Sequence, residues 1–181
     1  MMMKRALFIF FGLTFLSPFA FAWGNKKMEG TVIYISDGDT LVVKPAKQKH
    51  EIKCRLYGID APEVAHEGKP GQPFGEEAAD ELEKMSLGKS VKVELTGERS
   101  YDREICIVTV DGWDLNREMI RRGFAWAYEK HLKGSYKKSY MAAEEEARKS
   151  GVGIWSAVDA LPPWEFKKEY WHLDPAPSIK E

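Results

Sequence analysis

The chain has 181 residues, of which 44% are hydrophobic, 30% charged and 12% aromatic. These proportions exclude collagen-like, disordered and disulfide-dense chains and indicate an ordinary globular protein of one domain. The formal net charge of -1 provides no overall positive field, so any polyanion would have to be bound by a local cluster of basic groups.

The N-terminus predicts an export signal. Lys4 and Arg5 precede an apolar run over residues 6–19, and Ala20-Phe21-Ala22 then supplies small residues at alternating positions. A membrane anchor is the alternative, but the run is shorter than the roughly 20 residues that a spanning helix needs. We therefore expect residues 1–22 to be a Sec-type signal peptide cleaved after Ala22, and the mature protein to be secreted or periplasmic and free of the membrane.

Three strands are predicted first, over residues 31–35, 41–44 and 52–57. The turn Asp37-Gly38-Asp39-Thr40 between the first two is typical of a hairpin. In the third strand Cys54 and Leu56 alternate with Arg55, which places Arg55 on the exposed face. Residues 58–73 are rich in proline and glycine and predict a loop.

Helical spacing then predicts a helix over residues 76–87, followed by strands over 91–95 and 105–110. Asp114 is expected to cap a helix that ends near Arg122, and Ser135 a last helix that ends near Gly151. This order predicts an α+β, mainly β fold: a five-stranded OB-fold barrel with three helices, covering residues 23–160. A parallel α/β sheet would need strands and helices to alternate.

The tail over residues 161–181 contains prolines and tryptophans and shows no period. We expect Trp164 and Trp171 to pack back on the domain and the chain beyond Asp174 to be disordered. Cys54 and Cys106 form an even pair in an exported chain, so they are either one disulfide or two small buried side chains. Without neighbouring histidines they do not predict a zinc site.

Charged side chains follow the predicted strand ends and turns, where the loops at one rim of a barrel can bring them together. Carboxylates beside a carbonyl oxygen suit Ca²⁺, and paired guanidinium groups suit a phosphate. Each residue also has a structural interpretation, as a turn former or as a partner in a surface ion pair. The set comprises Asp37, Asp39, Arg55, Asp60, Glu63 and Arg103.

Three motifs in this order closely resemble those of the staphylococcal nuclease (thermonuclease-like) family. They are Asp37-Gly38-Asp39-Thr40, the segment from Cys54 to Glu63, and Tyr101-Asp102-Arg103 before an apolar strand. Later segments from Gly123 to Tyr128 and from Gly151 to Trp155 resemble further family blocks. The likeness extends from about Glu29 to Ser156.

The resemblance implies an OB-fold barrel and Ca²⁺-dependent phosphodiester cleavage, and it assigns roles to eight residues. Asp39, Asp60 and the main-chain carbonyl of Ala61 match the cation ligands, and Glu63 matches the carboxylate that assists the attacking water. Arg55 and Arg103 match the two phosphate-binding arginines, and Tyr101 and Tyr128 fall near positions that line the nucleotide pocket.

Two positions depart from the family pattern. Ala61 replaces a threonine, which matters little if only its carbonyl is a ligand. Asp102 stands where glycine is usual, so its carboxylate either competes for the Arg103 guanidinium or points away from it. Strand alternation favours the second interpretation.

The sequence therefore predicts an exported nuclease that hydrolyses DNA and RNA with Ca²⁺, leaves 3′-phosphates, and acts as a monomer without a stable protein partner. Lys69, Lys133, Lys137 and Lys138 either flank the cleft or form an ordinary solvated surface. The alternatives are a non-catalytic OB-fold module that binds nucleic acid, and an exported domain that binds another ligand through its tryptophan-rich tail.

Overall fold

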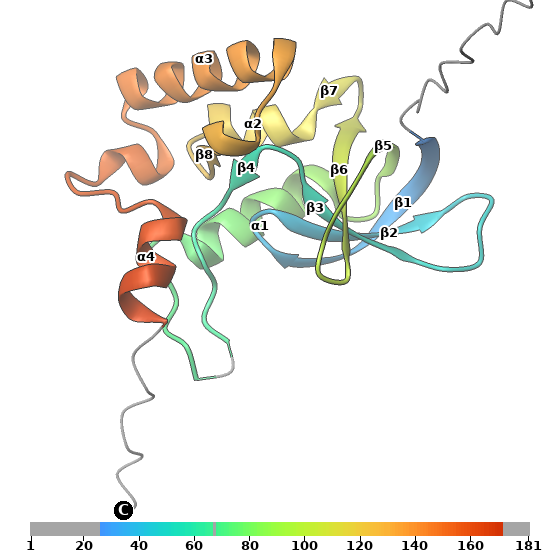
Figure 1. Cartoon of the computed structure of the whole chain (residues 1–181), viewed down its shortest axis with the longest axis horizontal. Helices are drawn as coiled ribbons and strands as arrows, with labels where there is room; N and C mark the ends of the chain where they lie inside the picture. Colours follow the sequence, from blue (N-terminus) through green and yellow to red (C-terminus); the bar gives the residue numbers. More distant parts are fainter. Residues whose placement is uncertain (1–25, 67, 172–181) are drawn as a thin grey trace, which may run out of the picture.

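The computed structural model describes residues 26–66 and 68–171 (Figure 1). Its strands are β1 (Lys26–Asp37), β2 (Thr40–Pro45), β3 (Ile52–Leu56), β4 (Ile59–Asp60), β5 (Ser90–Ser100), β6 (Arg103–Val110), β7 (Trp113–Asp114) and β8 (Trp126–Ala127). The helices are α1 (Gly75–Ser86), α2 (Leu115–Arg121), α3 (Gly134–Ser150) and α4 (Pro163–Tyr170), with short 3-10 turns η1 (Glu129–His131) and η2 (Gly153–Ser156).

A closed ring of five strands forms the centre of the molecule. The strands follow the order β3-β2-β1-β5-β6, and β6 pairs in parallel with β3, which closes the ring. The short strand β7 pairs antiparallel with the C-terminal end of β6. All other pairings within the ring are antiparallel. This arrangement confirms the predicted α+β fold with its five-stranded OB-type barrel.

The barrel interior is filled by apolar side chains from the strands, among them Leu56 of the alternating third strand. Val32, Leu41, Val43, Leu56 and Val93 are almost completely buried. Helix α1 begins and ends within one residue of its predicted bounds and buries Ala78 and Leu82. Helices α2 and α3 pack on each other at one end of the barrel (Figure 1).

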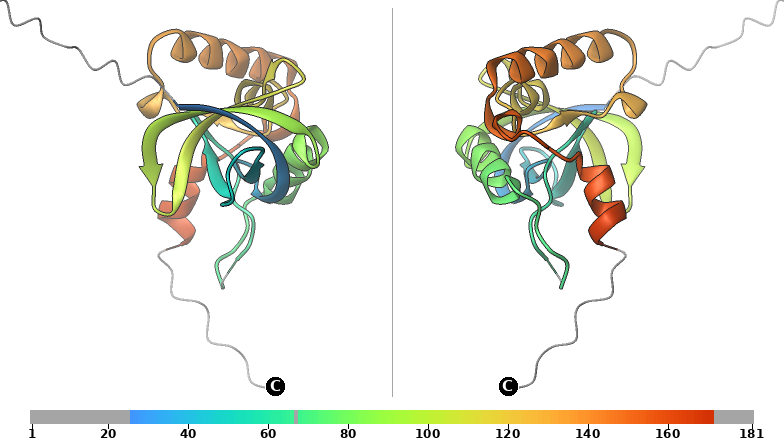
Figure 2. Two further views of the ribbon diagram at one scale, coloured as in Figure 1. Left: turned by 90° about the vertical axis from the view of Figure 1, so that its right-hand side faces the viewer. Right: turned by 90° about the vertical axis from the view of Figure 1, so that its left-hand side faces the viewer.

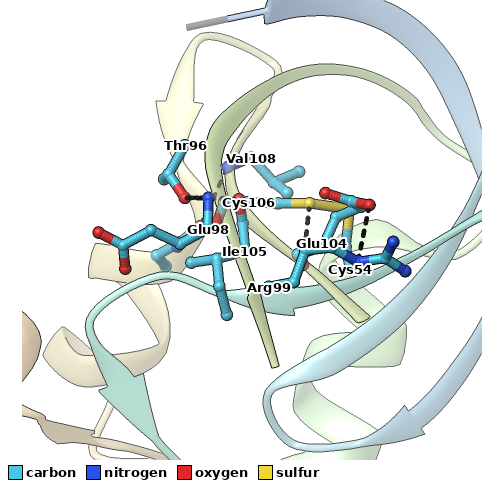
Figure 3. Close-up of a disulfide and its surroundings, with 9 residues drawn as sticks. Cys54, Thr96, Glu98, Arg99, Glu104, Ile105, Cys106 and Val108 are labelled. Atoms are coloured by element: carbon cyan, nitrogen blue, oxygen red, sulfur yellow. Dashed lines mark hydrogen bonds and ion pairs between the residues drawn. A yellow bond between two sulfur atoms is a disulfide. The ribbon is translucent and has the colours of Figure 1, made fainter. Parts of the chain in front are cut away.

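Cys54 and Cys106 are joined in a disulfide with a Cα–Cα distance of 5.6 Å, which settles the alternative left open by the sequence (Figure 3). The bond links β3 to β6 where they pair in parallel. The buried side chain of Asn116 supports the same junction: its amide donates to the carbonyls of Tyr57 and Cys106 and its oxygen accepts the N–H of Val108.

Two predictions from the sequence are wrong. The tail has no apolar period over its length, but residues 163–170 form helix α4, with a proline in the first turn and Phe166 buried. The segment from Gly58 to Pro73 is not entirely loop, because Ile59 and Asp60 pair with Ala127 and Trp126 as strands β4 and β8. Two-residue strands carry no periodicity from which they could be recognised.

Helix α4 lies at the end of the barrel from which the loop after β4 projects (Figures 1 and 2). Trp164 and Trp171 pack back as expected, the first on Tyr128 and the second on His66. The predicted signal peptide and the chain beyond Asp174 lie outside the described residues. Within residues 26–66 and 68–171, no helix has the length and hydrophobicity to cross a bilayer.

Candidate active site

The turn between β1 and β2 presents Asp39 to the site. Asp37 accepts the backbone N–H of Asp39 at 2.9 Å, an interaction typical of such turns, so Asp37 has the structural role. Gly38 lets the turn approach its neighbours closely, because a Cβ there would lie 2.7 Å from the Cβ atoms of Ala61 and Ala78. The result is an Asp39 side chain that is only 3% exposed.

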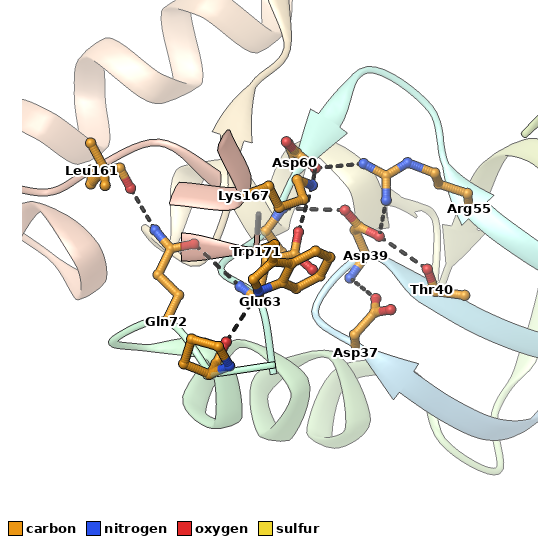
Figure 4. A network of polar contacts seen from close by, with 12 residues as sticks. Asp37, Asp39, Thr40, Arg55, Asp60, Glu63, Gln72, Leu161, Lys167 and Trp171 are labelled. Atoms are coloured by element: carbon orange, nitrogen blue, oxygen red, sulfur yellow. Dashed lines mark hydrogen bonds and ion pairs between the residues drawn. The ribbon is translucent and has the colours of Figure 1, made fainter. Parts of the chain in front are cut away.

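Arg55 bridges the two predicted metal-binding aspartates (Figure 4). Its Nη1 lies 2.6 Å from Asp39 Oδ1 and its Nη2 lies 2.5 Å from Asp60 Oδ1. β3 pairs with β2 so that Arg55 is opposite Thr40, which brings the guanidinium beside the β1–β2 turn. Asp39 and Asp60, which are 21 positions apart in the chain, therefore both form ion pairs with the Arg55 side chain.

Asp60 and Ala61 are held by the main chain. Asp60 lies in β4, pairs with Trp126 of β8 and is only 2% exposed. The N–H of Ala61 donates to Asp39 Oδ2 at 3.2 Å. This bond brings the peptide after Asp60 to the same place as the Asp39 carboxylate.

Glu63 follows in the loop that packs against the start of α1. Gly75 is required there, since a Cβ on it would collide with the Glu63 carbonyl. The Glu63 N–H donates to the side chain of Gln72, and its carbonyl accepts the Gln72 N–H. The Glu63 carboxylate therefore projects from a fixed backbone.

Arg103 reaches the site from the start of β6. Its Nη1 donates to Thr40 Oγ1 at 2.9 Å, and this hydroxyl in turn donates to Asp39 Oδ1 at 3.0 Å. Asp102 instead pairs with Lys53 at 3.2 Å on the surface. Its carboxylate therefore has a partner other than the Arg103 guanidinium, which agrees with the milder interpretation of this departure from the family pattern.

The two tyrosines differ. Tyr101 occupies the turn between β5 and β6 with a positive φ of 57° and is 94% exposed. Tyr128 is partly buried, donates its N–H to the Gly58 carbonyl at 2.9 Å, and stacks on Trp164 with ring centroids 5.1 Å apart. Only Tyr128 is fixed by its surroundings.

One cavity of about 940 Å³ unites the site. Its lining includes every residue that the sequence singled out for a role: Asp39, Arg55, Asp60, Ala61, Glu63, Tyr101, Arg103 and Tyr128. Of the four lysines considered, Lys69 lines the cavity, whereas Lys133 and Lys137 form ion pairs with Glu98 and Glu129.

Sequence reasoning missed Lys167. This residue projects from α4 and places Nζ 2.6 Å from Glu63 Oε1 and 3.5 Å from Asp60 Oδ1 (Figure 4). Pro162-Pro163 followed by Phe166 and Tyr170 was an available signal for the helix, because proline favours the first helical turn and the aromatic spacing fits one face. Nothing in the sequence indicated where that helix docks.

Burial and charge act against each other on the carboxylates. Burial would raise the pKa of Asp39, but the Arg55 charge, the hydrogen bond from the Ala61 N–H and further nearby positive charges together outweigh burial and hold the pKa below its usual range. Burial and the neighbouring Asp39 charge raise the pKa of Asp60. Burial also raises the pKa of Glu63, although Lys167 partly offsets the effect. Of these three carboxyl groups, Asp39 alone has a pKa that is shifted downward.

The oxygen ligands fit a hard cation. Two buried carboxylates converge on one guanidinium, and the Asp39–Ala61 hydrogen bond brings a peptide group beside them. Carboxylates and main-chain carbonyls are the groups that Ca²⁺ prefers. Among the described residues no group of three or more His, Cys, Asp or Glu side chains is arranged to hold a metal ion.

Comparison with known proteins agrees with this geometry. A family model described as "Staphylococcal nuclease homologue" matches residues 53–157. A protein of Komagataella phaffii named "Probable endonuclease LCL3" is 33% identical over 175 residues, covering 81% of this chain and 77% of the relative. An "Uncharacterized endonuclease" of Haemophilus influenzae is 32% identical over 148 residues, covering 82% and 78%.

"Endonuclease Htp3" of Saprolegnia parasitica is 30% identical over 169 residues, covering 83% of this chain and 80% of the relative. The matched family segment contains Arg55, Asp60, Glu63 and Arg103, and the motif with Asp39 precedes it. This chain therefore belongs to the staphylococcal nuclease family, a family of nucleases.

Proposed function

We propose that the protein is an exported, Ca²⁺-dependent endonuclease that hydrolyses phosphodiester bonds of DNA and RNA and leaves 3′-phosphates. One observation carries the proposal: five charged side chains from four separate segments line one cavity, with Arg55 in contact with both Asp39 and Asp60. The endonuclease names of the relatives support the same substrate class.

The two arginines suit the binding of a phosphate. A planar guanidinium can donate two parallel hydrogen bonds to phosphate oxygens. Arg55 is oriented by its two carboxylates and Arg103 by Thr40, so neither has to be ordered when a substrate arrives. Fixed donors of this kind stabilise the charge that develops as phosphorus becomes five-coordinate.

Glu63 suits the activation of water. In the proposed reaction its carboxylate orients a water molecule and accepts its proton as the water oxygen bonds to phosphorus. The bond from phosphorus to the 5′-oxygen breaks, that oxygen takes up a proton, and the phosphate remains on the 3′-oxygen. Arg55 or Arg103 balances the negative charge on the departing oxygen.

Asp39, Asp60 and the Ala61 carbonyl would hold the cation. When bound, Ca²⁺ supplies positive charge that polarises the phosphate and neutralises its oxygens. Asp39 keeps its negative charge because Arg55 lowers its pKa. Tyr101 and Tyr128 provide aromatic faces at the same cavity, where bases can stack.

The test incubates the purified mature chain with labelled single-stranded DNA or RNA, in Ca²⁺ or in EGTA. Cleavage with Ca²⁺ that stops with chelator, and products whose 3′ ends are phosphatase-sensitive, would support the proposal. Retention of the oligonucleotide without cleavage would indicate a non-catalytic binding module, and neither cleavage nor retention would exclude nucleic acid as the ligand. Export is tested separately, by finding the N-terminus of the secreted protein at Trp23.

A further inference from the structure

Helix α4 lies outside the part of the chain that the family model matches, yet it contacts the site directly. The matched segment ends at residue 157 and α4 begins at Pro163. Two side chains of this helix, Trp164 and Lys167, line the same cavity as the proposed catalytic residues. Each of them contacts a group to which the proposed function assigns a ligand: Lys167 contacts the carboxylates of the cation site, and Trp164 contacts the ring of Tyr128.

Lys167 places a positive charge between Glu63 and Asp60, next to the two carboxylates that Arg55 bridges. Its ammonium nitrogen is 2.6 Å from Glu63 Oε1 and 3.5 Å from Asp60 Oδ1, and Asp60 is almost completely buried (Figure 4). Oxygen ligands surround Ca²⁺ at about 2.3–2.6 Å, so a metal ion bound to Asp60 and the ammonium would compete for the same small space. Two like charges so close together in a partly buried site repel strongly.

Trp164 occupies the place of a nucleobase. Its indole lies 5.1 Å from the Tyr128 ring, centroid to centroid, with an angle of 13° between the planes. This is the geometry that a base would adopt on an aromatic side chain. The face of Tyr128 that Trp164 covers is therefore closed to a substrate while α4 is docked.

Helix α4 is docked through its ion pairs and aromatic contacts at the cavity and through a small apolar contact. Phe166 and Pro163 are its buried residues, and the Gln72 amide donates to the Leu161 carbonyl just before the helix. After the helix, Trp171 donates to the Pro70 carbonyl at an exposed position and its ring contacts His66 and Lys69. A helix of eight residues is not stable alone in water, so α4 keeps its form only while it is docked. A ligand that displaces Lys167 and Trp164 removes much of what holds it.

We infer that α4 is an autoinhibitory strap, in which Lys167 takes the place of the divalent cation and Trp164 the place of a stacked base. The inference rests on the proposed function, because it needs the cation and the base to use the sites assigned above. Cation and substrate then bind only as α4 leaves, so the apparent affinity of the site for Ca²⁺ includes the cost of undocking the helix.

The first experiment measures Ca²⁺ binding directly, by isothermal titration calorimetry on the full mature chain. Lys167→Met removes the ammonium and keeps the aliphatic stem, whereas Lys168→Met is the matched control, since the Lys168 side chain is 78% exposed and pairs with Glu165. We expect Lys167→Met to bind Ca²⁺ about tenfold more tightly or better. The control should stay within about twofold of the wild type.

The outcomes separate the two proposals. If the wild type binds Ca²⁺ and Lys167→Met binds it equally or more weakly, the strap is wrong while the proposed cation site stands. If none of the three proteins binds Ca²⁺, the proposed function fails and the strap with it. Binding by Lys167→Met alone would support both.

A second experiment needs no variant and guards against a misfolded one. Hydrogen exchange of the wild-type chain is followed by mass spectrometry with and without saturating Ca²⁺. Peptides that cover residues 163–171 should exchange faster when Ca²⁺ is bound, while peptides from β2 and β3 should not. Unchanged or slower exchange of α4 in the Ca²⁺-bound protein would overturn the inference.

Discussion

The disulfide between Cys54 and Cys106 lies directly beside Arg55, the side chain that bridges the two buried aspartates of the site. It therefore holds β3, which carries Arg55, against β6, which begins with Arg103. The same covalent link supports the fold and the spacing of the two guanidinium groups.

Loss of this disulfide should lower stability substantially. The bond closes a loop with a sequence separation of 52, and the chain-entropy relation gives about 4 kcal/mol for a loop of that length. We expect the double variant Cys54→Ala, Cys106→Ala to lose about 2–4 kcal/mol in urea unfolding. Dithiothreitol should destabilise the wild type to a similar degree and leave the double variant unchanged, and an equal effect of dithiothreitol on both would contradict this role.

Replacement of Arg55 by lysine should abolish most of the activity while the fold persists. A lysine keeps the charge, but it cannot bridge Asp39 and Asp60 and still donate a paired hydrogen bond to a phosphate. We expect kcat to fall by about 100-fold or more, the scale seen when a fixed donor to a developing negative charge is lost. Arg121→Lys is the control, since Arg121 pairs with Glu118 and does not line the cavity. Near-native turnover of Arg55→Lys would remove Arg55 from the mechanism.

Tyr101 should contribute to substrate affinity but not to stability. Its side chain is 94% exposed in the turn between β5 and β6 and lines the cavity. Loss of one stacking contact costs about 1–3 kcal/mol, so Tyr101→Ala should raise KM by about fivefold or more at unchanged kcat and melting temperature. Trp113→Ala, at an exposed aromatic residue outside this cavity, should leave KM unchanged. An unchanged KM for Tyr101→Ala would exclude Tyr101 from the binding surface.

Asp114 should make stability fall as the pH rises from about 4. Burial raises the pKa of this carboxyl above its ordinary value of 3.8, although hydrogen bonds from the Arg117 N–H and the Tyr140 hydroxyl oppose the effect. In this window the folded state keeps a proton that the unfolded state has released, so the free energy of unfolding decreases with rising pH until the folded-state pKa is passed.

Asp114→Asn keeps a side chain that can cap α2 and removes the titration. The difference in stability between the wild type and this variant should therefore shift against the wild type between pH 3.8 and the higher pKa of the folded protein. Asp111→Asn, at an exposed carboxylate, is the control variant for the effect of removing one acidic group. If the wild type instead gained stability relative to Asp114→Asn as the pH rises, the pKa of Asp114 in the folded protein would be lowered and not raised.

Local patterns were enough to predict the barrel and to select the residues that line the cavity. Alternating apolar residues define β3, and the turn chemistry of Asp37-Gly38-Asp39 fixes the hairpin between β1 and β2. Arg55, Asp60 and Glu63 lie within one short segment, so their proximity needs little knowledge of the rest of the fold.

The features that the sequence did not predict are those that depend on distant partners. β4 exists because Asp60 meets Trp126 of β8, and Asn116 is buried only because three main-chain groups at the β3–β6 junction need its amide. Lys167 meets Glu63 across 104 positions of the chain. No local period records contacts of this kind.

The parallel pairing of β3 with β6 sets the order in which the chain can fold. β1, β2 and β3 follow one another through short connections and can assemble as hairpins within microseconds, whereas β6 reaches β3 only after α1 and β5 have been laid down between them. Closure over so long a segment carries a large entropic cost, so the ring closes late. Helix α4 docks on Glu63 and Tyr128, which follow β3 and precede α3 in the chain, so its docking surface is complete only when the segments on both sides of the ring closure are in place.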